Sequence, residues 1–225
     1  MWLNSNVGAD TLSGFVNQWN DQSANGYDFI QNISSKRPSI NSSYLLNNHQ
    51  AIKFDGSNDF LERSAIPFID TSDFTLFIIS SGADQSGVLA GLLYIGGWNS
   101  GFWFFRWTNS TEKFSARING GTVNTPNGSA PNIGYSGSLL SLNRVVNDST
   151  NLYLNGVITQ TNTSASMNQS FINNIIRIGV APGRPSFHGD IAEIILYNRS
   201  LSYFEQQQVE QYLMDKYAPA VDLGN

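Results

Sequence analysis

The chain has 225 residues, of which 40% are hydrophobic and only 13% are charged, and its net charge is −5. The charged share is about half that of an ordinary soluble domain, so Asn, Ser, Thr and Gly supply much of the surface polarity. The negative charge argues against a nucleic-acid-binding face, the absence of cysteine excludes disulfides, and no apolar run approaches the ~18 residues that would insert into a membrane.

Short alternating or apolar runs between turn signals predict an all-β fold. The predicted strands cover residues 51–55, 74–80, 102–107, 113–119, 139–146, 151–154, 175–179 and 191–197. Asn155-Gly156 is the strongest hairpin signal, because this pair tolerates the positive φ angles of a type I′ turn. No linker divides the chain, so we expect one domain over residues 1–219 and a tail over residues 220–225.

One helix is predicted near the C-terminus. Ser202 and Glu205 have the spacing of a capping box, in which each side chain satisfies a backbone amide of the other residue. Apolar residues then follow at helical spacing to about Tyr217, before Pro219. The strand at 191–197 is apolar on both faces, so we expect one face to meet the core and the other to be covered by this helix or by a long loop.

Three stretches carry a family resemblance: residues 19–26 (WNDQSANG), 51–61 (AIKFDGSNDFL) and 187–202 (FHGDIAEIILYNRSLS). Together they resemble the concanavalin A-like lectin/glucanase superfamily in its laminin-G-like form of bacterial and phage type. The resemblance implies a two-sheet antiparallel jelly-roll sandwich with one short C-terminal helix. It also implies a module of a longer secreted protein, but it does not by itself choose between binding and catalysis.

Catalytic residues are not predicted. The glucanases of this superfamily carry a Glu-x-Asp-x-Glu motif on one strand, because alternate residues place two carboxylates about 5.5 Å apart. None of the five glutamates here has an Asp two residues away. A glycoside hydrolase, with its carboxylates brought together from distant strands, is therefore the least favoured function.

The densest aromatic stretch, residues 102–107, predicts a strand with two aromatic rows. One row should belong to the core, while the other is either covered by loops or exposed to a sugar. Trp98 in the adjacent Gly-rich loop is the best candidate for stacking, since few neighbours are expected there. The predicted ligand-binding residues are Trp98, Asn99, Trp103, Arg106, Arg184 and His188.

A structural Ca²⁺ is the predicted cofactor. Asp21, Asn25 and Asp28 lie in an oxygen-rich, Gly-containing loop, and Ca²⁺ prefers such ligands. The predicted metal residues are Asp21, Asn25, Asp190 and Glu193. Glu193 lies among isoleucines, where a carboxylate requires a cation or several hydrogen-bond donors, and Arg177 or Lys53 is the alternative to metal.

The leading functional hypothesis is a non-catalytic, carbohydrate-binding, lectin-like module outside the cell, on a cell surface or on a virion. Its partner would be a glycan or a cell-surface polysaccharide. The alternative is a structural or adhesive domain that contacts other surface or virion proteins and has no sugar site. A solvent-filled groove beside Trp98 and Trp103 would favour the lectin, whereas a fully packed aromatic row would favour the scaffold.

Overall fold

The computed structural model describes residues 1–67, 69–70, 72–82, 89–107, 113–127, 137–168, 170–171, 174–181, 183–184 and 186–217, and for residues 41–45, 89, 107 and 168 it describes the backbone alone. The fold is all-β, with mostly antiparallel strands and one C-terminal helix, α2 (Tyr203–Tyr217). Shorter helical turns are α1 (Ser5–Gly8), η1 (Ser34–Lys36) and η2 (Ala165–Asn168). None of the described helices is long and apolar enough to cross a membrane.

Eight of the strands correspond to the predicted ones. They are β6 (His49–Asp55), β8 (Phe74–Gly82), β10 (Phe102–Trp107), β11 (Lys113–Ile118), β13 (Ser138–Val145), β14 (Ser149–Leu154), β16 (Ile175–Ile178) and β17 (His188–Tyr197). The remaining strands are β1 (Trp2–Asn4), β2 (Ala9–Leu12), β3 (Phe15–Trp19), β4 (Phe29–Ile30), β5 (Ser39–Leu46), β7 (Leu61–Ser64), β9 (Leu89–Ile95), β12 (Gly121–Asn124) and β15 (Val157–Asn162). The predicted Asn155-Gly156 turn joins β14 to β15, and both residues have positive φ, 49° and 79°.

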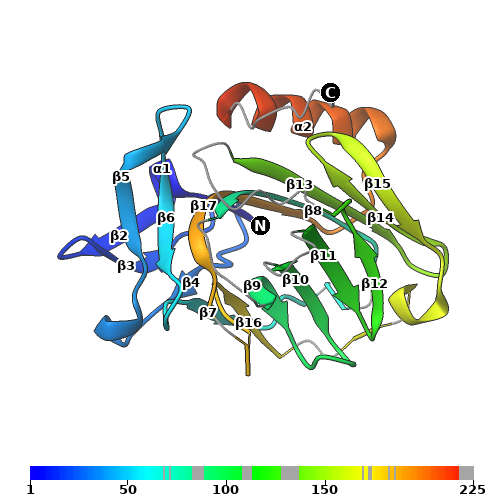
Figure 1. Cartoon of the computed structure of the whole chain (residues 1–225), viewed down its shortest axis with the longest axis horizontal. Helices are drawn as coiled ribbons and strands as arrows, with labels where there is room; N and C mark the ends of the chain where they lie inside the picture. The colour runs from blue at the N-terminus through cyan, green and yellow to red at the C-terminus, as the bar shows by residue number, and fades with distance from the viewer. Residues whose placement is uncertain are drawn as a thin grey trace.

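The strands form one continuous hydrogen-bonded network, so the expected division into two sheets is met only in part. The network is continuous because β16 pairs with both β7 and β9, while β17 pairs with both β6 and β8. It curls until β12 approaches β15 (Figure 1). The Asn124 amide donates to Gln160 Oε1 at 2.7 Å, and Asn162 Nδ2 donates to the Thr122 carbonyl at 3.0 Å. The overall shape is therefore nearly barrel-like.

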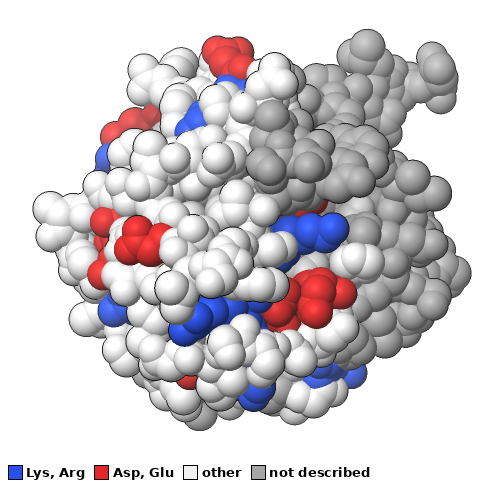
Figure 2. Space-filling view, turned by 90° about the vertical axis from the view of Figure 1, so that its left-hand side faces the viewer, with Lys and Arg blue, Asp and Glu red and all other residues white. Residues whose placement is uncertain are grey.

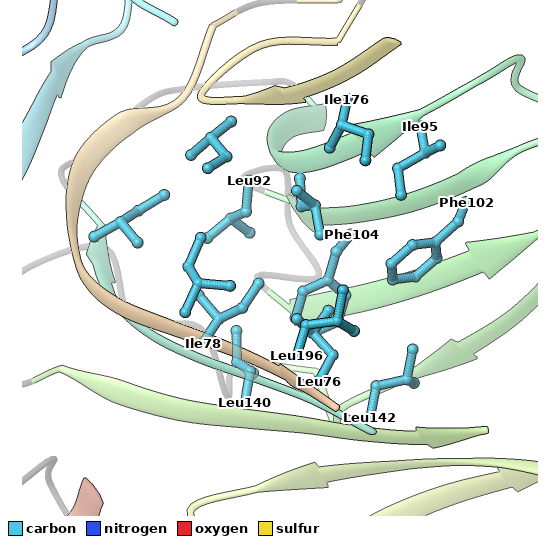
Figure 3. Close-up of a cluster of buried hydrophobic side chains, with 14 of the residues drawn as sticks. Leu76, Ile78, Leu92, Ile95, Phe102, Phe104, Leu140, Leu142, Ile176 and Leu196 are labelled. Atoms are coloured by element: carbon cyan, nitrogen blue, oxygen red, sulfur yellow. The ribbon is translucent and has the colours of Figure 1, made fainter. Parts of the chain in front are cut away.

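The main core lies inside this curl. Side chains of β8, β13 and β17 face those of β9, β10 and β16 across it (Figure 3). The labelled residues are Leu76, Ile78, Leu140, Leu142 and Leu196 on one side and Leu92, Ile95, Phe102, Phe104 and Ile176 on the other. Each large apolar side chain that is buried here contributes about 1.5–3 kcal/mol to folding.

Helix α2 covers the outer face of β8, β13 and β17, which confirms that the second apolar face of β17 is covered. Leu213 and Tyr217 of the helix pack with Phe77, Leu139 and Ala192 in a second apolar cluster. The capping box is also confirmed: the Ser202 amide donates to Glu205 Oε2 at 2.9 Å, and the Glu205 amide donates to Ser202 Oγ at 3.4 Å.

A β-bulge in β17 changes the expected alternation of its side chains. Ile191 is opposite Ser80 on β8, but Glu193 is opposite Ile79, so Ala192 is an extra residue in the pairing. Ile191 and Ile194 consequently face the main core, whereas Ala192 packs toward α2. The bulge thus leaves the Glu193 carboxylate within reach of α2, where it meets Lys216 and Tyr217.

Candidate functional site

The aromatic rows of β10 are both buried. Phe102 and Phe104 belong to the main core. Trp103 and Phe105 point to the opposite face, are 5% and 1% exposed, and form a separate cluster with Ala181. The interpretation that one row is core and the other is covered by loops is therefore confirmed for the side chains that the structure describes.

Trp98 covers this second row. It lies in the loop between β9 and β10 and is half-buried. Its ring centroid is 4.8 Å from that of Trp103 and 5.9 Å from that of Phe105. Tyr94 completes the group, with its ring 4.9 Å from Trp103. Trp98 therefore has more neighbours than its Gly-rich loop indicates, because the loop folds back onto its own strand.

Two arginines lie against the Trp98 indole. The guanidinium carbons of Arg117 and Arg184 are 4.2 Å and 4.9 Å from its centroid, within cation–π range. Arg117 is also held by hydrogen bonds from Nε to the Trp98 carbonyl, at 3.1 Å, and from Nη2 to Asn99 Oδ1, at 2.9 Å. Burial lowers the pKa of Arg117, but a guanidinium remains charged at neutral pH.

These side chains form what we call the Trp98 cluster: Tyr94, Trp98, Asn99, Trp103, Arg117 and Arg184. Four of them are among the predicted ligand-binding residues. Arg117 and Tyr94 were not predicted. Arg117 is directly opposite Trp103 in the β10–β11 pairing. The two residues are separated in the sequence, so the sequence alone does not show that they are neighbours.

The structure places the other two predicted ligand residues elsewhere. Arg106 is 1% exposed and shares the inward face of β10 with Phe104; its guanidinium lies against Gly82, where any side chain would collide with it. His188 is half-buried at the start of β17, opposite Asp55. Neither residue contributes a described contact to the Trp98 cluster.

The four predicted metal residues each have protein partners. The Asp21 carboxylate accepts hydrogen bonds from the amides of Trp2, Ser23 and Tyr27 at 2.7–3.0 Å. Burial alone would raise the pKa of Asp21, but these bonds outweigh it and hold the pKa below its ordinary value. Exposed Asn25 donates to Ser23 Oγ at 2.9 Å.

Asp190 accepts a hydrogen bond from Ser81 Oγ at 3.3 Å. Within the described part of the chain, no three His, Cys, Asp or Glu residues form a group suited to a metal ion. The carboxylates of the Asp21 loop and of Glu193 are satisfied by protein donors. Calcium binding stays a prediction.

Glu193 is the most heavily hydrogen-bonded carboxylate of the described residues. Its side chain is 0% exposed, and Lys216 Nζ lies 2.7 Å from Oε2. Its other donors are Trp2 Nε1 at 2.6 Å, Asn4 Nδ2 at 3.3 Å, Tyr212 Oη at 3.2 Å and Tyr217 Oη at 2.6 Å. Glu193 was expected to need a cation or several hydrogen-bond donors, and the structure provides both. Lys216 supplies the cation, rather than Arg177 or Lys53 as predicted, and Arg177 pairs with Glu62 at 2.9 Å.

Comparison with solved structures finds the same fold in proteins of low sequence identity. Domain 4 of an extracellular arabinanase from Geobacillus stearothermophilus, solved with arabinotriose, has a TM-score of 0.61 at 13% identity, over 93% of this chain and 97% of that one. The binding domain of botulinum neurotoxin serotype G has a TM-score of 0.64 at 13% identity over 87% of this chain, which spans about half (48%) of that domain.

The sialidase carbohydrate-binding module CBM40 of Ruminococcus gnavus, solved with α2,3 sialyllactose, has a TM-score of 0.52 at 16% identity, over 71% of this chain and 96% of that one. No curated protein sequence matches this chain. The family model Laminin_G_3, described as the concanavalin A-like lectin/glucanases superfamily, matches residues 55–205, which is most of the chain. The chain therefore belongs to the concanavalin A-like lectin/glucanase superfamily.

Proposed function

We propose that the chain is a non-catalytic, lectin-like carbohydrate-binding module of a larger secreted or surface protein, built on a two-sheet jelly-roll. The observation that carries the proposal is the Trp98 cluster. A half-buried indole, two guanidinium groups and an exposed amide meet there within one small surface. Such a combination of an aromatic platform and a few fixed polar groups suits a hydroxyl-bearing ring.

Hydrogen bonds hold part of the Trp98 cluster in place before a ligand binds. Arg117 holds the Trp98 loop through the Trp98 carbonyl and orients the Asn99 amide. Trp103 Nε1 donates to the Gly97 carbonyl at 3.1 Å, so the indole beneath the loop is also fixed. Arg184 is exposed, and we propose that its guanidinium moves off the indole to donate hydrogen bonds to the sugar. A fixed platform reduces the entropy lost on binding.

The surface chemistry supports a neutral or weakly acidic glycan. Figure 2 shows one face on which Lys, Arg, Asp and Glu form small neighbouring groups within a largely uncharged surface. Such a surface offers many hydrogen-bonding groups and no extended field of one sign. Two of the structural neighbours were solved with oligosaccharides, arabinotriose and sialyllactose, which supports a glycan as the partner class.

The described glutamates support a non-catalytic role. Glu62 pairs with Arg177, Glu193 with Lys216 and Glu205 with Arg199, while Glu210 accepts a hydrogen bond from Gln206. Glu112 lies outside the described residues. A retaining or inverting hydrolase requires two carboxylates facing each other across a substrate, and these four have structural partners instead.

The second candidate is a structural or adhesive domain without a sugar site. The near-complete burial of Trp103 and Phe105 favours it, because their strand face is filled by protein rather than open as a groove. The contribution of Trp98 to glycan binding separates the two candidate functions. Trp98 is half-buried, so a ligand can reach the exposed edge of its indole.

A glycan array, run with and without EDTA, would find the ligand, and titration calorimetry would measure its affinity. We expect dissociation constants from about micromolar to millimolar, because a shallow site buries few ligand atoms. Trp98→Ala should weaken binding by about tenfold or more, while Phe204→Ala, which removes a 76% exposed ring on α2, should leave it unchanged. Equal affinities for both variants and the wild type would refute this site.

A further inference from the structure

A second concave surface lies on the helix side of the molecule. It is a groove of about 750 Å³ between the end of β17, helix α2 and the loop at residues 21–27, and we call it the α2 groove. It shares no lining residue with the Trp98 cluster, which is formed by β9, β10, β11 and the loop after β16. Its volume falls within the range of small-molecule sites.

Aromatic rings form the walls of the α2 groove. Trp2 and Tyr212 are 36% and 42% exposed, and Tyr27 and Tyr197 are half-buried. Exposed rings that line a concavity provide flat apolar faces, on which the C–H faces of a sugar ring can pack.

The buried Glu193 holds two of these rings in place. Its Oε1 accepts hydrogen bonds from Trp2 Nε1 at 2.6 Å and from Tyr212 Oη at 3.2 Å. Lys216 donates to Glu193 at 2.7 Å and to Tyr212 Oη at 3.0 Å, so the helix is part of the same network. The ring positions are therefore fixed before any ligand arrives, and little side-chain entropy remains to be lost on binding.

The polar groups of the groove are amides and internally compensated charges. Asn25, Asn198 and Gln208 are exposed and line it. Arg199 and Glu205 also line it, but they form a bidentate pair with distances of 2.9 Å and 2.7 Å. A charged ligand would gain little from groups that neutralise each other, whereas amides donate to and accept from hydroxyl groups.

We propose that the α2 groove is a second binding site, which takes a neutral saccharide through the Trp2 and Tyr212 rings and the amides of Asn198 and Gln208. Glu193 acts as a positioning residue, because it contacts the rings and not the ligand. The site does not depend on the Trp98 cluster. A module with both sites would bind a multivalent glycan surface more tightly than either site alone.

The indole N–H signal of Trp2 in a ¹⁵N-labelled sample provides the direct test. We expect neutral oligosaccharides, titrated up to about 10 mM, to shift this signal, which Trp2→Phe assigns among the five tryptophans. Val209→Trp, which fills the groove from α2, should abolish the shift. The double variant Asn198→Ala/Gln208→Ala should weaken saccharide binding at least ~3-fold. It provides the test if Val209→Trp does not fold.

Phe204→Ala is the matched control, since this exposed helix residue does not line the groove and should leave the Trp2 shift unchanged. A Trp2 signal that no neutral saccharide moves, or that moves equally in the wild type and the double amide variant, would overturn the proposal. Shifts caused only by apolar peptides would also overturn it. If Trp98→Ala abolishes saccharide binding and Val209→Trp leaves it intact, the α2 groove is refuted as a site but the proposed function stands. The reverse pattern would refute the Trp98 cluster alone.

Discussion

Replacing Lys216 with Met tests the buried network that connects α2 to the sheet. The Glu193 side chain is fully buried, and the Lys216 side chain is 16% exposed, with 2.7 Å between Nζ and Oε2. Removing one partner of a buried ion pair costs about 3–5 kcal/mol, because the other charge stays buried. Here four neutral donors remain on Glu193, so we expect the lower end, about 3 kcal/mol.

Urea denaturation at pH 7 would measure this loss, and the melting temperature should fall by about 6–12 °C for a domain of this size. Lys36→Met is the control: this lysine lies 5.7 Å from the Phe60 ring centroid, and its loss should cost less than about 1 kcal/mol.

A double-mutant cycle with Glu193→Gln isolates the pair, because the helix-dipole contribution of Lys216 cancels in it. We expect a coupling of about 1–3 kcal/mol. A coupling of zero within error, or a Lys216→Met variant as stable as the wild type, would refute the reasoning.

Three further predictions concern single carboxylates and the helix cap. Burial, reinforced by the Asp55 carboxylate, raises the pKa of Asp59 to about 6, so the folded state favours the protonated form. The resulting contribution to stability is full below about pH 4 and is lost as the pH rises through about 6. Relative to Asp59→Asn, the wild type should therefore lose about 2 kcal/mol between pH 4 and pH 8 in urea titrations, and parallel curves would contradict this. Ser202→Ala should lower the free energy of unfolding by about 0.5–1 kcal/mol, the low end for a helix cap, because Ser202 Oγ is 3.4 Å from the Glu205 amide. Thermal melts would measure the loss, and an unchanged melting temperature would mean that the cap is not stabilising. The predicted calcium should raise the melting temperature relative to EDTA, and Asp21→Asn should remove the difference; identical melts of the wild type in calcium and EDTA would exclude the site.

Most of the long strands could be predicted because their apolar pattern is local, but the eight-residue β5 and the seven-residue β9 were missed. β10 has the predicted bounds, Phe102–Trp107, and the Asn155-Gly156 turn has the predicted φ angles. The two-residue β4 could not be predicted, because its pairing depends on partners far along the chain. The bulge at Ala192 was also missed. The residues around it are apolar on both faces of the strand, so an extra residue does not interrupt the apolar pattern in the sequence.

The candidate site was predicted where chemistry is local and missed where it depends on register. Trp98 and Asn99 stand out as a Trp and an amide in a Gly-rich loop. Arg117 reaches them because β11 pairs with β10 in the register that places it opposite Trp103. Arg106 was expected beside the ligand but lies on the inward face of β10, because a sequence pattern shows which residues share a face and not which face is inside.

The closeness of β12 and β15 affects how copies of this domain behave when they lie near one another. A strand with an unpaired edge can recruit the strand of another chain and start aggregation. Here β12 and β15 meet, and the side-chain amides of Gln160 and Asn162 on β15 take up two backbone groups of β12, the Asn124 amide and the Thr122 carbonyl. Among the described strands, β1 and β2 also pair with one strand each, and they are three and four residues long, too short to nucleate such pairing well. The contact between β12 and β15 therefore removes one place at which neighbouring copies could exchange strands.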